Sequence, residues 1–254
     1  MSPPKPAGYV APPPPSLMDA LRSLGVVFTD LVPHLARLAL HSELLSTDTP
    51  EGSKSIRTAF GRTLRRAGVT LEVLHAERVP SEGGLVLMWN QESHLDHLVL
   101  GAAIPRPFLS LYNNEVARVP FYGAQMKRTG HIHVDRTSEA QWRASVSQAA
   151  ARAQQGACIL VSPEGTRSWD GELLPMKRGA FLLAAAAAQP LICVTVIGGH
   201  DRMPRGSVVV RRGLIRVVFS EPIPTAGELA DRLAPRVAET FRTSKAQYRL
   251  PARV

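Results

Sequence analysis

The chain has little cysteine, and its two cysteines suggest neither a disulfide framework nor a metal site. Cys158 and Cys193 both lie in apolar runs, without a Cys-x-x-Cys pattern or the spacing of zinc ligands. We therefore expect both to be small core residues in a reducing compartment, and we expect no metal and no cofactor.

Long hydrophobic runs are also missing. No run of about 18 apolar residues occurs, so no transmembrane helix is expected. The proline-rich residues 1–15 contain no apolar segment typical of a signal peptide, and we expect them to form a mobile arm.

Acidic residues are outnumbered, with 21 Asp and Glu against 30 Lys and Arg, which gives a net charge of +9. Such a surface suits nucleic acid, anionic lipid or a phosphorylated substrate, or serves solubility alone. No zinc finger, RNP-type aromatic motif or Gly-x-x-Gly loop supports nucleic-acid binding, so a nucleic-acid partner is not expected.

What the chain does contain is the ordinary composition of a globular protein, with 44% hydrophobic and 20% charged residues in 254. Residues 16–66 are expected to be helical. Ser16 can cap a helix with Asp19 at its third position, and Pro33 should kink or end it. We expect this segment to pack on the domain that follows, with a membrane interface as the alternative.

Residues 67–254 alternate between short strands and helices. Strands are predicted at 85–89, 132–134, 158–161 and 191–197, helices at 95–103, 140–155, 180–188 and 226–245, and a late hairpin from 208–210 and 215–219. This alternation predicts an α/β fold whose mixed, largely parallel sheet has helices on both faces and follows N-terminal helices.

Polar segments directly follow three of these strands, at residues 90–96, 135–136 and 162–167. Ligands of such sheets bind beyond the carboxyl ends of the strands. Taken singly, each segment is better explained as a helix cap, a turn or a solvated ion pair than as part of a site. Together they would bring carboxylates and arginines to one rim of the sheet.

The order and spacing of these segments resemble the glycerol-phosphate and lysophosphatidate acyltransferases, over roughly residues 70–225. That family's motifs are Asn-His-x-Ser-x-x-Asp, Gly-x-Ile-Phe-Ile-Asp-Arg and Phe-Pro-Glu-Gly-Thr-Arg-Ser. Residues 90–96 read Asn-Gln-Glu-Ser-His-Leu-Asp, residues 130–136 read Gly-His-Ile-His-Val-Asp-Arg, and residues 162–168 read Ser-Pro-Glu-Gly-Thr-Arg-Ser.

The resemblance implies an enzyme of phospholipid biosynthesis. It would move a fatty acyl group from acyl-CoA or acyl-carrier protein to a hydroxyl of a lysophospholipid or glycerol-phosphate acceptor. It would work at the membrane surface, peripherally on its cytoplasmic face. Asp96 would orient the catalytic base, and the acceptor would be held by Arg136, Glu164, Gly165, Thr166 and Arg167.

Gln91 departs from the family, because it stands where the family has its basic histidine. A glutamine amide cannot take a proton from an alcohol, so activity is expected to be weak or absent. Three explanations remain: a substitution that silences the enzyme, a lipid or acyl-thioester binding protein on the same fold, or replacement by His94 or His97. The spacing of both histidines disfavours the last.

Asn113 is a second departure, since the family often has a lysine there. Its lack of charge leaves room for an acceptor that is not a glycerolipid.

Overall fold

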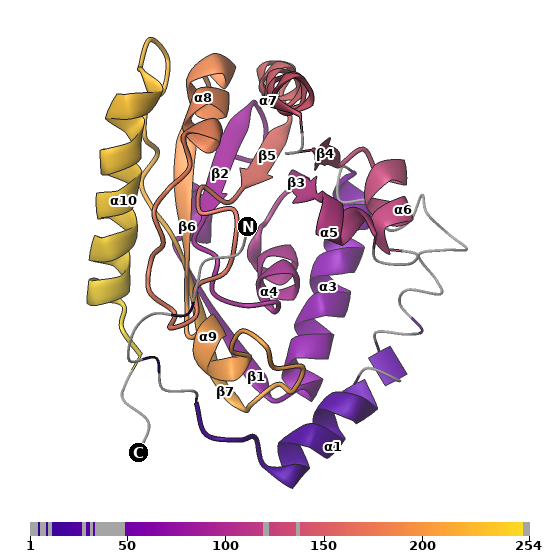
Figure 1. The fold of residues 1–254 in the computed structure, drawn as a ribbon. Coiled ribbons are helices and arrows are strands. Elements are labelled where there is room, and N and C mark those ends of the chain that lie inside the picture. The colour runs from indigo at the N-terminus through magenta and orange to yellow at the C-terminus, as the bar shows by residue number, and fades with distance from the viewer. Residues whose placement is uncertain are drawn as a thin grey trace.

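The structure is a computed structural model that describes residues 5, 9, 12–26, 29, 30, 33, 49–118, 122–135 and 138–250. Its centre is a seven-stranded sheet in the order β1-β7-β6-β2-β5-β3-β4 (Figure 1). Neighbouring strands are parallel except β6 and β7. The strands are β1 (Val69–Leu74), β2 (Leu85–Trp89), β3 (Leu109–Asn113), β4 (Ile132–Val134), β5 (Cys158–Val161), β6 (Leu191–Ile197) and β7 (Gly213–Phe219).

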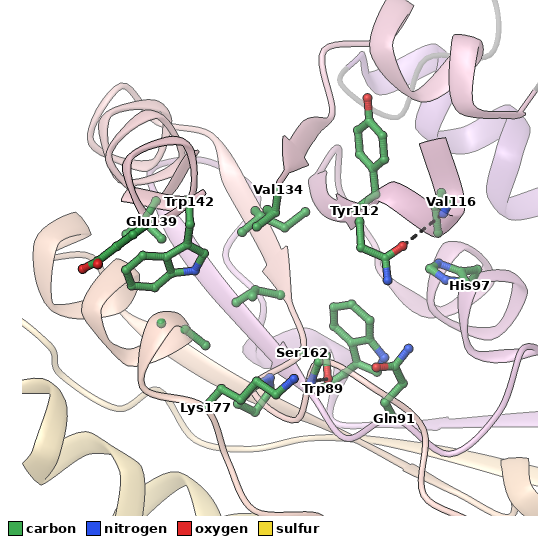
Figure 2. Close-up of a pocket in the computed structure, with 18 residues that line it drawn as sticks. Trp89, Gln91, His97, Tyr112, Val116, Val134, Glu139, Trp142, Ser162 and Lys177 are labelled. Atoms are coloured by element: carbon green, nitrogen blue, oxygen red, sulfur yellow. Dashed lines mark hydrogen bonds between the residues drawn. The ribbon is translucent and has the colours of Figure 1, made fainter. Parts of the chain in front are cut away.

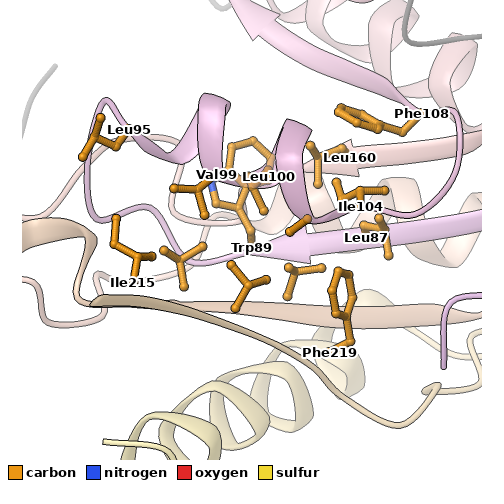
Figure 3. Packing of buried hydrophobic residues seen from close by; sticks show 14 of the residues in the cluster. Leu87, Trp89, Leu95, Val99, Leu100, Ile104, Phe108, Leu160, Ile215 and Phe219 are labelled. Atoms are coloured by element: carbon orange, nitrogen blue, oxygen red, sulfur yellow. The ribbon is translucent and has the colours of Figure 1, made fainter. Parts of the chain in front are cut away.

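Helices cover both faces of this sheet, and each face has its own apolar core. On one face lie α3 (Pro50–Arg66) and α4 (Asp96–Ala103). Figure 3 shows Val99 and Leu100 of α4, with Ile104 directly after it, packed over Leu87 and Trp89 of β2. On the other lie α7 (Glu139–Gln154), α8 (Arg178–Ala187) and α10 (Ala230–Gln247). The α/β fold expected from the alternating pattern is confirmed.

The remaining helices are short or peripheral. They are α1 (Leu17–Val26), the 3-10 turn η3 (Ala76–Arg78), α5 (Asn114–Ala117), α6 (Tyr122–Arg128) and α9 (Gly199–Arg202). Within the described part of the chain, none of the helices has both the length and the apolar composition of a membrane span.

Both cysteines are buried and unpaired in the core. Burial raises the pKa of each thiol to about 12, so neither is a reactive thiolate.

The N-terminal helix begins where its cap predicts. The Ser16 hydroxyl accepts a hydrogen bond from the Asp19 N–H at 3.1 Å, and α1 follows from Leu17. Ser23 and Val26 are buried where α1 meets the domain, and Arg22 donates to the carbonyl of Ala67 at 2.8 Å, whereas Leu17 is 74% exposed. Helix α1 therefore packs on the domain with one side, and much of its apolar stripe lies outside that contact. Most of residues 31–48, where further helix was predicted, lie outside the described residues.

The predicted late hairpin is also wrong. Residues 208–210 form no strand, and β7 instead pairs in parallel with β1 and antiparallel with β6. Gly213 begins β7 with φ 141°, and a Cβ there would lie 1.6 Å from Nη1 of Arg202. The Ser23 hydroxyl of α1 accepts from the N–H of Val210 at 2.9 Å. This segment therefore hydrogen-bonds to side chains, where a hairpin would have used a partner strand.

Candidate active site

The first motif begins where β2 ends. The side chain of Asn90 donates to the carbonyl of Val196 at 2.9 Å and accepts from the same residue's N–H at 2.7 Å. Asn90 thus continues the hydrogen bonding between β2 and β6 through its amide. This fixes the direction in which the chain leaves the sheet, and with it the position of Gln91.

Asp96 orders the loop that follows. Its Oδ2 accepts from the N–H groups of Glu92 and Ser93 at 2.9 and 3.0 Å, at the start of α4. Its buried Oδ1 makes no hydrogen bond to any described residue, so Asp96 does not orient the Gln91 side chain through one. Burial raises the pKa of Asp96 well above its usual range, against the hydrogen bonds from Ser93 and Glu92.

Glu164 joins the third motif to the first. Its side chain is buried, Oε1 accepts from the Gln91 N–H at 2.8 Å, and Oε2 accepts from the Leu174 N–H at 2.7 Å. Burial raises the pKa of Glu164 to about 7 despite these two hydrogen bonds. The carboxylate therefore braces the two loops, and its contact with an acceptor stays a prediction.

Arg167 lies beside the first motif, since the N–H of the next residue, Ser168, donates to the carbonyl of Gln91 at 3.4 Å. Burial lowers the pKa of Arg167, helped by Arg205, while Asp96 opposes the shift. The buried Nη1 of Arg167 makes no hydrogen bond to any described residue. Arg136 lies outside the described residues, so its predicted place at this rim has no structural account.

A cavity of about 460 Å³ adjoins these loops (Figure 2). Gln91 and His97 lie at one end of it, and Trp142 and Glu139 lie at the other. Gly165 also lines it with φ 64°, in the left-handed region that favours glycine. Most of its remaining lining is apolar: Trp89, Leu111, Val116, Val134, Val146, Val161, Pro163 and Ala180. Its size and lining are those of a small-molecule site.

Two basic residues of the lining, His97 and Lys177, are not among the predicted site residues. His97 follows Asp96 in the first turn of α4, and burial lowers the pKa of its imidazole to about 4. Lys177 precedes α8 and brings an ammonium group to the cavity, where Figure 2 shows it beside Ser162. The sequence analysis considered His97 only as a replacement for the missing base, a role that its spacing disfavours. Lys177 lies outside the three motifs, so no motif singled it out.

Asn113 also lines the cavity, as the cap of α5. Its Oδ1 accepts from the N–H of Val116 at 3.0 Å. The next residue, Asn114, donates to Asp135 of the second motif at 3.1 Å. This places the described end of the second motif beside α5. Thr166 is half-buried between Gly165 and Arg167.

Comparisons with known proteins point to one family. A 1-acyl-sn-glycerol-3-phosphate acyltransferase of Chlamydomonas reinhardtii is 30% identical over 166 residues, which cover 64% of this chain and 50% of the relative. The enzyme of the same name from Escherichia coli is 26% identical over 183 residues, which cover 71% of this chain and 73% of the relative. The chain thus spans about half the length of the algal relative.

The fold has a close counterpart among solved structures. The 1-acyl-sn-glycerophosphate acyltransferase PlsC from Thermotoga maritima superposes with a TM-score of 0.79 and 19% identity, over 93% of this chain and 99% of that one. At this identity the likeness shows the fold alone. The family model described as Acyltransferase matches residues 70–197, which contain all three motifs and the strands that carry them. This chain therefore belongs to the acyltransferase family.

Proposed function

We propose that this chain carries an acyl-transfer site that takes a fatty acyl group from an acyl-CoA or acyl-carrier-protein thioester to a hydroxyl of a lysophosphatidate-type acceptor. The relatives named above act on such an acceptor by their names. The observation that carries the proposal is the 2.8 Å hydrogen bond from Gln91 to Glu164, which joins the first and third motifs at one end of a largely apolar cavity.

The cavity supports binding of the acyl chain. Its apolar lining runs from Gln91 to Trp142, so an acyl group seated there would present its thioester carbonyl near Gln91. Burying the methylenes of the chain is favourable by about 0.8 kcal/mol each. Arg167 and Lys177 supply positive charge for the acceptor phosphate, and Arg136 is proposed to join them.

The reaction joins the acceptor oxygen to the carbonyl carbon and breaks the carbon–sulfur bond. The hydroxyl proton must leave, and the departing thiolate must gain a proton. The Gln91 amide can donate a hydrogen bond to the carbonyl oxygen but cannot take the hydroxyl proton. General-base catalysis contributes about 10²–10⁴-fold, so we expect slow turnover in the present sequence.

Gln91→His tests the proposal. The assay measures release of free thiol from acyl-CoA, and separately from acyl-carrier protein, with lysophosphatidate as acceptor. We expect the rate to rise by about a hundredfold or more over the Gln91 protein. Gln141→His, which adds the same residue at an exposed position of α7, is the matched control and should leave the rate unchanged. An unchanged rate with every donor would contradict the proposal that Gln91 silences an acyltransferase.

A non-catalytic acyl-thioester or lipid binding protein is the second candidate. It is favoured by the non-basic Gln91 and by Asp96 Oδ1, which hydrogen-bonds no described residue. It predicts acyl-CoA binding without turnover in Gln91→His, with binding abolished by Arg167→Ala. An acceptor other than a glycerolipid would instead give thiol release with a different alcohol or amine. Attachment at the cytoplasmic face of a membrane follows from the substrate class and stays a prediction.

A further inference from the structure

A second cleft, of about 620 Å³, lies between the start of α1 and the segment 202–212. It shares no lining residue with the cavity at Gln91. Four guanidinium groups line it, against the one carboxylate of Asp19. The four belong to Arg22, Arg202, Arg211 and Arg212. Acyl transfer, as derived above, uses none of them.

Hydrogen bonds between α1 and this segment hold the cleft together. Arg22 donates through Nε to the carbonyl of Ala67 at 2.8 Å and through Nη2 to that of Val210 at 3.2 Å. It also pairs with Asp19, and this hydrogen bond is the main cause of the lowered pKa of that carboxyl. Asp19 is therefore already engaged, and the cleft keeps an excess of positive charge.

Arg211 is the cation whose charge a bound anion would neutralise. It lines the cleft and is only 8% exposed, and its Nη2 donates to the carbonyl of Pro13. Its buried Nη1 makes no hydrogen bond within the described part of the chain, and no described carboxylate lies within 4.0 Å of the guanidinium. A buried cation without a counter-charge is costly, and a bound anion would remove that cost.

Apolar side chains stand beside this charge. On α1, Leu17, Met18, Leu21 and Leu24 are 74%, 70%, 57% and 55% exposed, and they form a stripe facing away from the domain. Met18 also lines the cleft, so the stripe and the arginines adjoin. On the segment opposite, Val208 is 82% exposed. An apolar helix stripe flanked by arginines is the pattern of helices that lie in a membrane interface.

We propose that the cleft binds the phosphate of an anionic phospholipid while the α1 stripe enters the apolar layer beside it. The planar fork of arginine matches phosphate oxygens and gives charge-assisted hydrogen bonds. A free phosphate would satisfy the arginines alone, whereas a phospholipid satisfies both the arginines and the exposed leucines. The surface made of the cleft and the stripe would hold the protein where its acceptor resides.

The test measures co-sedimentation of the full chain with vesicles, without acyl donor or acceptor, so its outcome is independent of acyl transfer. Vesicles of phosphatidylcholine with phosphatidylglycerol are compared with vesicles of phosphatidylcholine alone. Arg211→Gln with Arg212→Gln should weaken binding to the anionic vesicles by about tenfold or more. Arg143→Gln with Arg242→Gln removes the same charge from side chains that are 68% and 65% exposed, and should weaken it by less than about twofold.

Two exposed positions keep the test decisive if loss of Arg211 prevents folding. Arg212→Gln alone and Leu21→Gln alone should each lower binding to the anionic vesicles without changing the thermal unfolding midpoint. Equal losses for the cleft pair and the control pair would overturn the proposal, since only net charge would then matter. Unchanged binding for Leu21→Gln, or its conversion of a dimer to a monomer, would also overturn it, because the stripe would then face protein.

Discussion

Glu164 is 2% exposed, and its carboxyl group links the loop of the first motif at Gln91 to the loop at Leu174 that follows the third motif. Its pKa, raised from 4.5 to about 7, means that folded Glu164 binds its proton more tightly than the unfolded chain does. The stability that this proton contributes is therefore complete below pH 4.5 and is lost as the pH rises towards 7.

Glu164→Gln should flatten this dependence on pH. We expect the loss of unfolding free energy between pH 4.5 and 7 to shrink by up to about 3 kcal/mol, from the size of the pKa shift. Urea unfolding at both pH values measures it. Glu239→Gln, at an exposed carboxylate of α10, should keep the original slope. An identical slope in both variants would refute the raised pKa.

The sequence singled out Glu164 as part of a motif but could not predict what its oxygens do. The partners of Glu164 are backbone N–H groups at residues 91 and 174, and only the folded chain brings them within reach. His97 illustrates the same limit. Helical spacing separates it from Asp96, yet the cavity beside Gln91 reaches it.

At the scale of elements, α10 is tied to the first motif by one ion pair. Lys245 donates to Oε1 of Glu92 at 2.6 Å, and the Glu92 side chain is 4% exposed. Lys245→Met should lower the unfolding free energy by about 3–5 kcal/mol, because it leaves a buried carboxylate unpaired. Chemical unfolding measures the loss.

The matched variants for Lys245 separate charge from packing. Lys127→Met, at an exposed lysine of α6, should cost little, and adding Glu92→Gln to Lys245→Met should restore part of the loss. A double variant as unstable as the single one would argue that α10 is held mainly by its apolar face.

The contact between α7 and α8 gives a second prediction at this scale. A Cβ added at Gly179 would lie 2.6 Å from Cζ2 of Trp142. Gly179→Ala should therefore destabilise the native protein, by about 1–3 kcal/mol. In a Trp142→Ala background the clash is gone, and the same change should stabilise the helix by up to about 1 kcal/mol. Unfolding of all four proteins checks whether the sign reverses.

Buried strands were the easiest elements to predict. The runs at β2 and β5 are wholly apolar and that of β6 is interrupted only by Thr195, and the structure buries each of their residues. Strand β3 was missed because Leu109–Asn113 mixes apolar and polar residues. The hairpin failed because residues 208–210 look like a strand locally, while the partners of β7 are β6 and, far away in the chain, β1.

At the scale of the whole molecule, the domain boundary predicted between residues 66 and 67 would separate α3 from a core to which it contributes side chains. Ile56 and Leu64 of α3 are 4% and 1% exposed, and Leu64 belongs to the same core cluster as α4. A chain of residues 49–254 should keep a cooperative thermal transition, whereas residues 67–254 should lose it, since each such side chain contributes about 1.5–3 kcal/mol. Calorimetry of both chains tests this. If residues 67–254 unfold with the same transition as residues 49–254, the predicted boundary is supported.

The place of β7 has a consequence for how the protein is made. Strand β1 pairs only with β7 among the described strands, and partners such as Glu72 and Arg216 stand 144 residues apart. During synthesis β1 leaves the ribosome early and waits, at about 5–20 residues per second, for most of the chain to follow. The first of the described strands to be translated is thus among the last to find its neighbour, and the nascent chain must shield that edge until β7 has been made.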